Sequence, residues 1–499
     1  MPPVVDHECA LTAFVMEQQN KLQEQQKKLD SVIALAERQQ REIEQLKKSL
    51  IGPKSERSKK MASIDKAIGK PPSTPEEKLA RRRANAKARE QLQVETIKHK
   101  VPANERCCPQ CGNDQLDPLG AGRTTEVLEY VPGRFVRRRH IQEVLRCRCN
   151  GHVVTAAGAP KVIEQGHYGA SVIAHLIIAK CIDSLPIYRL EKSFAREGMH
   201  IKRSTMNDLF HKGADILEPL YKRHLEIIAK RHLVQADETR LRMLDDGEGK
   251  PQNGFIWTFV AADDKGGLDV AYRFAADRSG QTPREVLGGT SGFLLVDGFS
   301  GYNSIANVSS RIRAACHAHL RRYFHDSLTT SPVAQEAIDL ILDLYRVEHD
   351  AKQLGIVGSN SHLELRKLRS APARDRLKTW LDDNLNRHLP KSPIGVAIRY
   401  GLNQRAELGR FLDDARIPLD NNASERALRR VALGRKNFLF VGNANSGANI
   451  AGLYSLAATC EARSINPLTY LTDVLGRIGD HPASKLDELL PATWVAAPT

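Results

Sequence analysis

The chain has 499 residues, a net charge of +15 and 41% hydrophobic residues. This length is too great for one ordinary core, so we expect two to four structural units. No stretch approaches the ~18 consecutive apolar residues of a membrane-spanning helix, and the first residues lack the basic and apolar regions of a signal peptide. These features favour a cytoplasmic protein with no membrane partner, whose nine cysteines are not disulfides.

Residues 11–50 are predicted to form one helix, the main part of a coiled-coil segment at 1–51. Apolar residues recur there every seven positions: Val15, Leu22, Leu29, Ala36, Ile43 and Leu50. This spacing is typical of a leucine-zipper-like coiled coil. Glutamines occupy several of the companion positions, so the seam is polar and weak. A lone surface helix packed on its own protein is the alternative.

Positive charge is concentrated after this helix, which Gly52 and Pro53 end. Residues 51–100 hold 14 Lys or Arg against 6 Asp or Glu. Such a charge cluster in a stretch with proline and serine favours a nucleic-acid-binding arm over an inert basic surface. We therefore predict a basic linker at 52–100 and a polyanionic partner.

Two cysteine pairs follow in the segment 101–160. Cys108 and Cys111 form a CxxC pair, and Cys147 and Cys149 form a CxC pair. Four thiolates brought together from two turns can hold one tetrahedral zinc ion, which predicts a structural zinc module. Four buried thiols are the alternative, and Cys107, His140 and His152 remain as competing ligands.

Residues 161–230 are predicted to be helical. A helix ending near Gly198 is followed by another that begins around Lys202 and Arg203, with Ser204 as a candidate N-cap. Two helices joined by a glycine-containing turn, with basic residues at the second start, fit a helix-turn-helix-like DNA-binding region. A plain helical hairpin in the core is the alternative.

From residue 231 the pattern changes to β-strands, and the fold class becomes α/β. Strands are predicted at 232–244, 255–261, 270–274, 292–296 and 312–315, and helices at 281–287, through most of 317–415, at 421–431 and at 449–478. This order of elements is that of a ribonuclease-H-like domain. In that fold the first strand is central and lies beside the fourth.

Two aspartates fall on those two strands. Asp237 lies within the first strand, and Asp297 ends the short apolar fourth strand. Carboxylates that converge in this way can bind two divalent cations, one to activate a nucleophile and one to stabilise a leaving oxygen at phosphorus. Each aspartate alone is more often a turn or cap residue.

A third carboxylate is expected on a late helix. Asp420 or Asn421 can cap the helix, which places Glu425 in its first turns at the positive end of the dipole. Arg426, Arg429 and Arg430 follow on the same helix and could hold phosphates. An ordinary surface helix is the alternative.

At this point the chain resembles the DDE transposases of the insertion sequence 66 family. The resemblance is carried by GPKSER at 52–57, DSLPIYR at 183–189, ADET at 236–239, DGFSGY at 297–302, ACHAHLRR at 315–322, LDNNASER at 419–426 and ALGRKNF at 432–438. These motifs span nearly the whole chain. The family commonly has proline where this chain has Val431 after Arg430, a difference that concerns only the helix exit.

The resemblance implies a DDE integrase-type, ribonuclease-H-like catalytic domain that cleaves DNA at insertion-sequence ends and transfers the strands. It implies Asp237, Asp297 and Glu425 as catalytic ligands of two Mg²⁺ or Mn²⁺ ions, a structural Zn²⁺, and DNA contacts that include Arg435 and Lys436. Cys316 and His319 form a CxxH arrangement with a structural or DNA-contacting role. Expected partners are double-stranded DNA with terminal inverted repeats, target DNA, further copies of the chain on DNA, and accessory proteins of the element. Such a protein would lie at the bacterial nucleoid.

The expected domains are the coiled coil at 1–51, the linker at 52–100, the zinc module at 101–160, the helical DNA-binding region at 161–230, the first part of the catalytic core at 231–325, a helical insertion at 326–417, the Glu-bearing helix at 418–445 and a C-terminal helical segment at 446–499. Two other functions stay open on the residues alone. A nuclease of the same fold would hydrolyse DNA without strand transfer, and a DNA-binding regulator or relic would lack catalysis.

Overall fold

The computed structural model describes residues 75–76, 79–80, 83, 133, 135–141, 143–146, 153–155, 162–163, 166–244 and 251–496. The chain divides into two compact units, Met1–Asp117 and Pro118–Thr499, and every element described below belongs to the second. The predicted coiled coil, most of the linker, and the zinc ligands Cys108, Cys111, Cys147 and Cys149 lie outside the described residues. Strands β1 (Val144–Arg146) and β2 (Val153–Thr155) pair antiparallel.

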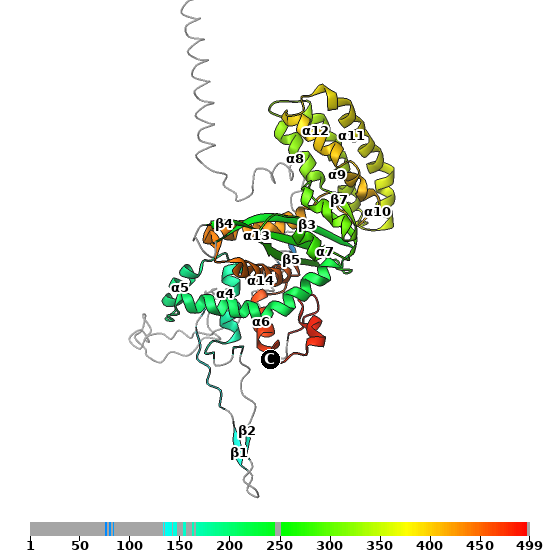
Figure 1. Cartoon of the computed structure of the whole chain (residues 1–499). Helices are drawn as coiled ribbons and strands as arrows, with labels where there is room; N and C mark the ends of the chain where they lie inside the picture. Colours follow the sequence, from blue (N-terminus) through cyan, green and yellow to red (C-terminus); the bar gives the residue numbers. More distant parts are fainter. Residues whose placement is uncertain are drawn as a thin grey trace, which may run out of the picture. The chain divides into compact units, whose positions relative to one another are not determined.

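A mixed six-stranded sheet is the centre of the second unit (Figure 1). Its strands are β3 (Leu233–Leu244), β4 (Pro251–Ala262), β5 (Leu268–Ala275), β6 (Ser291–Val296), β7 (Ser310–Ala315) and β8 (Phe440–Val441). The order is β5-β4-β3-β6-β7, and β8 also pairs with β3. Strands β3, β4 and β5 pair antiparallel, whereas β6 runs parallel to β3 and β7 parallel to β6. Strand β3 is therefore central, with the antiparallel strand β4 on one side and the parallel strand β6 on the other.

Helices from both ends of the described chain share one core with the sheet. They are α4 (Ala170–Cys181), α5 (Ile187–Arg196), α6 (Arg203–Ala229), α13 (Asn422–Phe438), α14 (Ala444–Ala462) and α15 (Pro467–Arg477). The backbone N–H of Tyr272 donates to the Ser455 hydroxyl at 2.8 Å, and that of Val270 donates to the Thr459 hydroxyl at 3.0 Å. Helix α14 thus satisfies the backbone of the edge strand β5, which would otherwise be open to pairing with another chain.

The other face of the sheet carries a smaller layer. It consists of α7 (Gln281–Leu287) and the 3-10 helix η2 (Ser300–Asn307), which pack with the end of α6. Trp257 and Tyr302 meet there edge to face, with ring centroids 5.7 Å apart. Side chains of β3 therefore alternate between two covered faces, as the period of a strand requires.

A helical insertion separates β7 from α13 in sequence (Figure 1). Its elements are α8 (His317–Ser327), α9 (Ala334–Gln353), α10 (Asn360–Leu365), the π-helix η3 (Arg366–Ser370), α11 (Ala371–Asn384), η4 (Leu385–Arg387), α12 (Pro393–Asn403) and η5 (Glu407–Leu412). The insertion has its own core, and a second apolar cluster joins it to the sheet through Phe293 and Leu295 on β6 and Phe411 and Leu419 from the insertion.

The predicted strands and helices of 231–325 are confirmed within a few residues, but three other details differ. Helix α6 begins at Arg203 with Lys202 as N-cap, so Ser204 lies inside it. Helix α13 continues past residue 431 to Phe438. The helix predicted at 449–478 is two helices, α14 and α15, separated by Ser464, which has a positive φ of 58°, and by Pro467 at the start of α15. None of the helices in the described parts of the chain has the length and apolarity of a membrane span.

Candidate active site

Asp237 and Asp297 stand at the same level of the sheet. Strands β3 and β6 are parallel with Gln235 opposite Leu295, and each aspartate follows its paired residue by two positions. Neighbouring strands lie roughly 4.8 Å apart, so continuation of this register brings the two aspartates side by side. The sequence prediction that the first and fourth strands are neighbours is confirmed.

Asp237 is partly buried on β3. Its Oδ1 accepts a hydrogen bond from the backbone N–H of Glu238 at 2.8 Å. Burial, followed by the charges of Glu238, Asp297 and Glu425, raises the pKa of Asp237 from 3.8 to about 8. The three predicted carboxylates are therefore close enough to repel one another.

Asp297 is held at the end of β6 by its backbone and its neighbours. Its Oδ1 accepts from the backbone N–H of Phe299 at 2.9 Å, which fixes the turn after the strand. Its carbonyl oxygen accepts from Arg313 at 2.8 Å, and the same Arg313 nitrogen reaches Gln404 at 2.8 Å. Strand, turn and insertion thus converge on this residue.

Glu425 lies in the first turn of α13, as predicted. The helix has Asn421 as its N-cap position, although no side chain caps it. Burial raises the pKa of Glu425, Asp297 acts in the same direction, and Arg322 opposes it. The Nδ1 atom of His319 lies 3.6 Å from the Glu425 carboxylate, too long for a hydrogen bond, and this buried nitrogen has no hydrogen-bond partner.

The segment before α13 is bound to two distant parts of the sheet. The backbone N–H of Asn421 donates to Cys316 Sγ at 3.4 Å, and that of His317 donates to the Leu419 carbonyl at 2.8 Å. The fully buried Asn421 side chain donates to the Ala236 carbonyl at 3.4 Å, one residue before Asp237. The CxxH pair noted in the sequence, Cys316 and His319, therefore contacts the segment that carries Glu425.

Glu238 is a fourth carboxylate, which the sequence reasoning did not single out. Its Oε1 accepts from Arg278 at 2.8 Å, and its Oε2 accepts from the Tyr302 hydroxyl at 2.7 Å. The Arg278 guanidinium also lies over the Phe299 ring, 4.1 Å from its centroid. Glu238 thus has a cationic partner in Arg278, whereas Asp237 has none among the hydrogen bonds and ion pairs of the described residues.

The donor chemistry at this place fits a hard divalent cation. Such ions prefer carboxylate oxygens, and a bound cation would relieve the repulsion that, together with burial, raises the pKa of Asp237. Within residues 166–244 and 251–496, no three acidic, histidine or cysteine side chains already stand in a metal-coordinating arrangement. Asp237, Asp297 and Glu425 would therefore have to turn their carboxylates toward one another to hold an ion.

The residues predicted to contact DNA have different surroundings. Lys202, Arg426, Arg429 and Lys436 have exposed side chains, and Arg203 is exposed but ion-paired with Glu191 at 2.9 Å. Arg430 and Arg435 are less exposed and are bound by other parts of the protein. Arg430 pairs with Glu461 and donates to the Cys181 carbonyl, while Arg435 donates to Thr239 at 2.9 Å and to the Arg240 carbonyl at 3.0 Å.

Comparison with known proteins identifies the family. The model described as "Transposase IS66 family" matches residues 165–449, more than half of the chain and the whole of the site above. The chain belongs to the IS66 transposase family. The models described as "zinc-finger binding domain of transposase IS66" and "IS66 C-terminal element" match residues 105–150 and 455–492.

Three proteins of Sinorhizobium fredii are similar to this IS66 family member over most of their length. The protein printed as "Uncharacterized protein y4jD" is 34% identical over 412 residues, which cover 79% of this chain and 80% of that protein. "Uncharacterized protein y4qI" is 34% identical over 80% of this chain and 74% of its own. "Uncharacterized protein y4hP" is 30% identical, with coverage of 78% and 74%.

Family membership makes the chain a transposase, an enzyme that cuts DNA. The zinc-finger match covers all four predicted zinc ligands, which supports a structural zinc and DNA binding by this segment of the IS66 protein. The C-terminal element covers the second half of α14, α15 and the 3-10 helix η6 (Ala483–Leu489).

Proposed function

We propose that the chain cleaves DNA at the ends of an insertion sequence and joins those ends to target DNA in a ribonuclease-H-like active site. The strand order β5-β4-β3-β6-β7, with three antiparallel strands followed by two parallel ones, supports this fold. The observation that carries the proposal is the shared level of Asp237 and Asp297 on β3 and β6, with Glu425 close enough to act on both.

Asp237, Asp297 and Glu425 are the residues that would hold Mg²⁺ or Mn²⁺. Two such ions, when bound, would supply charge neutralisation at the attacked phosphate and activation of the attacking hydroxyl. Other groups of the chain would hold these carboxylates in position. The Phe299 N–H and Arg313 fix Asp297, and Asn421 ties the entrance of α13 to β3 beside Asp237.

DNA binding is proposed to rest on phosphate contacts. Lys202, Arg203, Arg426, Arg429 and Lys436 offer exposed cations, and the zinc module and the basic linker add others in sequence. Such contacts make affinity steeply dependent on salt. We further propose that terminal inverted repeats are the specific DNA partner, that two copies of the chain act together on it, and that accessory proteins of the element take part.

The test is a strand-transfer assay. The purified full chain is mixed with labelled DNA carrying the element's ends and a plasmid target, in Mg²⁺ or Mn²⁺, beside an Asp297→Asn control. Joined products that vanish in the control support the proposal. Cleavage without joining points to a nuclease of the same fold, and end binding without any chemistry points to a DNA-binding relic.

A further inference from the structure

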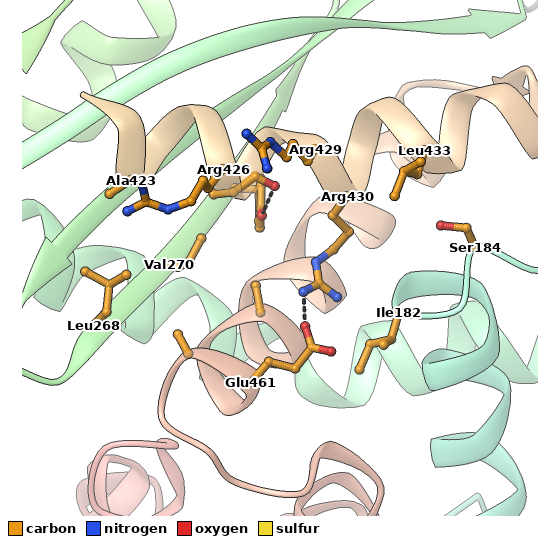
Figure 2. A pocket seen from close by; sticks show the side chains of 14 residues that line it. Ile182, Ser184, Leu268, Val270, Ala423, Arg426, Arg429, Arg430, Leu433 and Glu461 are labelled. Atoms are coloured by element: carbon orange, nitrogen blue, oxygen red, sulfur yellow. Dashed lines mark hydrogen bonds and ion pairs between the residues drawn. The ribbon is translucent and has the colours of Figure 1, made fainter. Parts of the chain in front are cut away.

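An open cleft runs along α13, between this helix and β5 (Figure 2). Its volume is about 460 Å³, within the range of roughly 300–1,000 Å³ typical of small-molecule sites. The floor comes from β5, one wall from α13, and the other from the end of α14 and the turn after α4.

The lining combines apolar surface with positive charge. Leu268, Val270, Leu433 and Ala458 are among its apolar residues, and its charged side chains are three arginines and one glutamate. Arg430 points to Glu461 and is neutralised by it, as Figure 2 shows. Arg426 and Arg429 carry exposed guanidinium groups at the rim. The lining therefore contains more positively than negatively charged side chains.

The cleft is next to the carboxylates. Arg426 directly follows Glu425, and a helix turns ~100° per residue, so the two side chains leave α13 on adjacent faces. Arg429 lies one turn after Glu425, and its charge is close enough to lower the pKa of that carboxyl. A group bound against the arginines at the rim would therefore lie beside the helix face that carries Glu425.

We propose that this cleft binds one unpaired nucleotide of the DNA strand adjoining the cleavage site, its phosphate against Arg426 and Arg429 and its base against the apolar wall. Guanidinium groups pair with phosphate oxygens and stack on bases, and apolar side chains accept the flat face of any base. A base within a duplex cannot enter a cleft of this kind, so the nucleotide must leave its stack. The inference rests on the proposed function, because it names the form of DNA that the same enzyme takes.

The test fills the cleft without touching the core. Ala462 lines the cleft, is exposed, and ends α14, so Ala462→Trp places an indole in the cleft. Ala444 is exposed at the opposite end of the same helix and does not line the cleft, so Ala444→Trp is the matched control. Circular dichroism checks folding, and Ala462→Leu replaces the tryptophan variant if that variant does not fold.

Binding of the full chain to a short labelled single strand and to a duplex of the same sequence is measured by fluorescence anisotropy. Ala462→Trp should weaken single-strand binding about tenfold and duplex binding less than about twofold, and Ala444→Trp should change neither. Equal binding by Ala462→Trp and the wild type, or equal losses on both probes, would overturn the inference. So would inorganic phosphate displacing the single strand as well as a mononucleotide does, since the cleft would then bind an anion alone. If the wild type lacks strand transfer but Ala462→Trp still loses single-strand binding selectively, the proposed function is contradicted while the nucleotide-binding cleft is supported.

Discussion

Asp237 on β3 and Asp297 at the end of β6 occupy the same level on neighbouring parallel strands, two residues beyond the paired Gln235 and Leu295. This relationship follows from a sheet in which the first and fourth strands are adjacent, although 60 positions of sequence separate the two residues. Its consequence is electrostatic. The negative charge of Asp297 adds to burial and to the charge of Glu238 in raising the pKa of Asp237, and a bound cation would offset the repulsion between the carboxylates.

Substitution of the two adjacent carboxylates on β3 should have different effects. Asp237→Asn removes a proposed cation ligand and should abolish strand transfer, whereas Glu238→Gln keeps an oxygen for Tyr302 and should retain at least about a tenth of the activity. Both variants are compared with the wild type in the strand-transfer assay, with end binding measured in parallel. Equal loss in both variants would mean that Glu238 also belongs to the reacting centre.

Metal-free protein should lose stability as pH rises through the pKa of Asp237. Folding raises this pKa from 3.8 to about 8, so the folded state holds a proton that the unfolded state releases. The stabilisation is complete below about pH 4 and is lost as pH approaches 8, at no more than about 1.4 kcal/mol per pH unit. Urea unfolding in chelator should show a steeper pH dependence for the wild type than for Asp237→Asn. The same pH slope in both proteins would contradict the position assigned to Asp237.

His319 should support catalysis without contributing to DNA affinity. Its ring lies 3.6 Å from Glu425, and such outer contacts to a ligand carboxylate typically change activity 10–100-fold. His319→Ala is therefore expected to lower cleavage at least about tenfold with end binding unchanged. His325→Ala, at an exposed position on the same helix, is the control and should behave as the wild type. Unchanged cleavage in His319→Ala would show that His319 does not support catalysis.

Substitutions of two basic residues of α13 that were predicted to contact DNA should differ in their effect on the salt dependence of DNA binding. Lys436 is exposed, so Lys436→Ala should reduce the slope of log affinity against log salt by about 1. Arg430 is only 17% exposed and pairs with Glu461, so Arg430→Ala should destabilise the fold by ~1–3 kcal/mol with little change in slope. A lower slope for Arg430→Ala without a loss of stability would instead support the predicted contact of Arg430 with DNA.

The purified chain should contain one zinc ion that chelators remove slowly. Cys108, Cys111, Cys147 and Cys149 lie within the segment that matches the zinc-finger model, and tetrahedral thiolate sites bind zinc tightly. Elemental analysis should find about one zinc per chain in the wild type and less in Cys111→Ser. Full zinc in Cys111→Ser would move the ligand set toward Cys107 or a histidine.

Local patterns in the sequence predict the sheet and the placement of its aspartates well. Alternation and apolar runs mark the strands, and the run Asp420-Asn421-Asn422 marks the start of the helix that carries Glu425, although no side chain caps that helix. The ends of elements are less predictable because distant residues decide them. The helix predicted at 421–431 continues to Phe438 as α13, and it passes through Gly434, where a Cβ would come within 2.7 Å of the Tyr454 hydroxyl. Helix α6 likewise runs for 27 residues despite Pro219 in its interior.

Contacts between distant segments could not be predicted from spacing. The CxxH motif is visible in the sequence, but its contact with the start of α13 spans 105 positions from Cys316 to Asn421. The partner of Arg430, Glu461, lies on a different helix, and only the packing of α14 against β5 brings it near. The contacts of Glu238 also come from distant segments, because Tyr302 lies on η2 and Arg278 lies between β5 and α7.

We propose that Asp237, Asp297 and Glu425 together form one cation site. Mn²⁺ binding by the full chain, followed by electron paramagnetic resonance, tests it most directly. We predict that Asp237→Asn, Asp297→Asn and Glu425→Gln each lose the same binding event that the wild type and Glu238→Gln retain. Wild-type Mn²⁺ binding in Asp297→Asn and Glu425→Gln would contradict the claim.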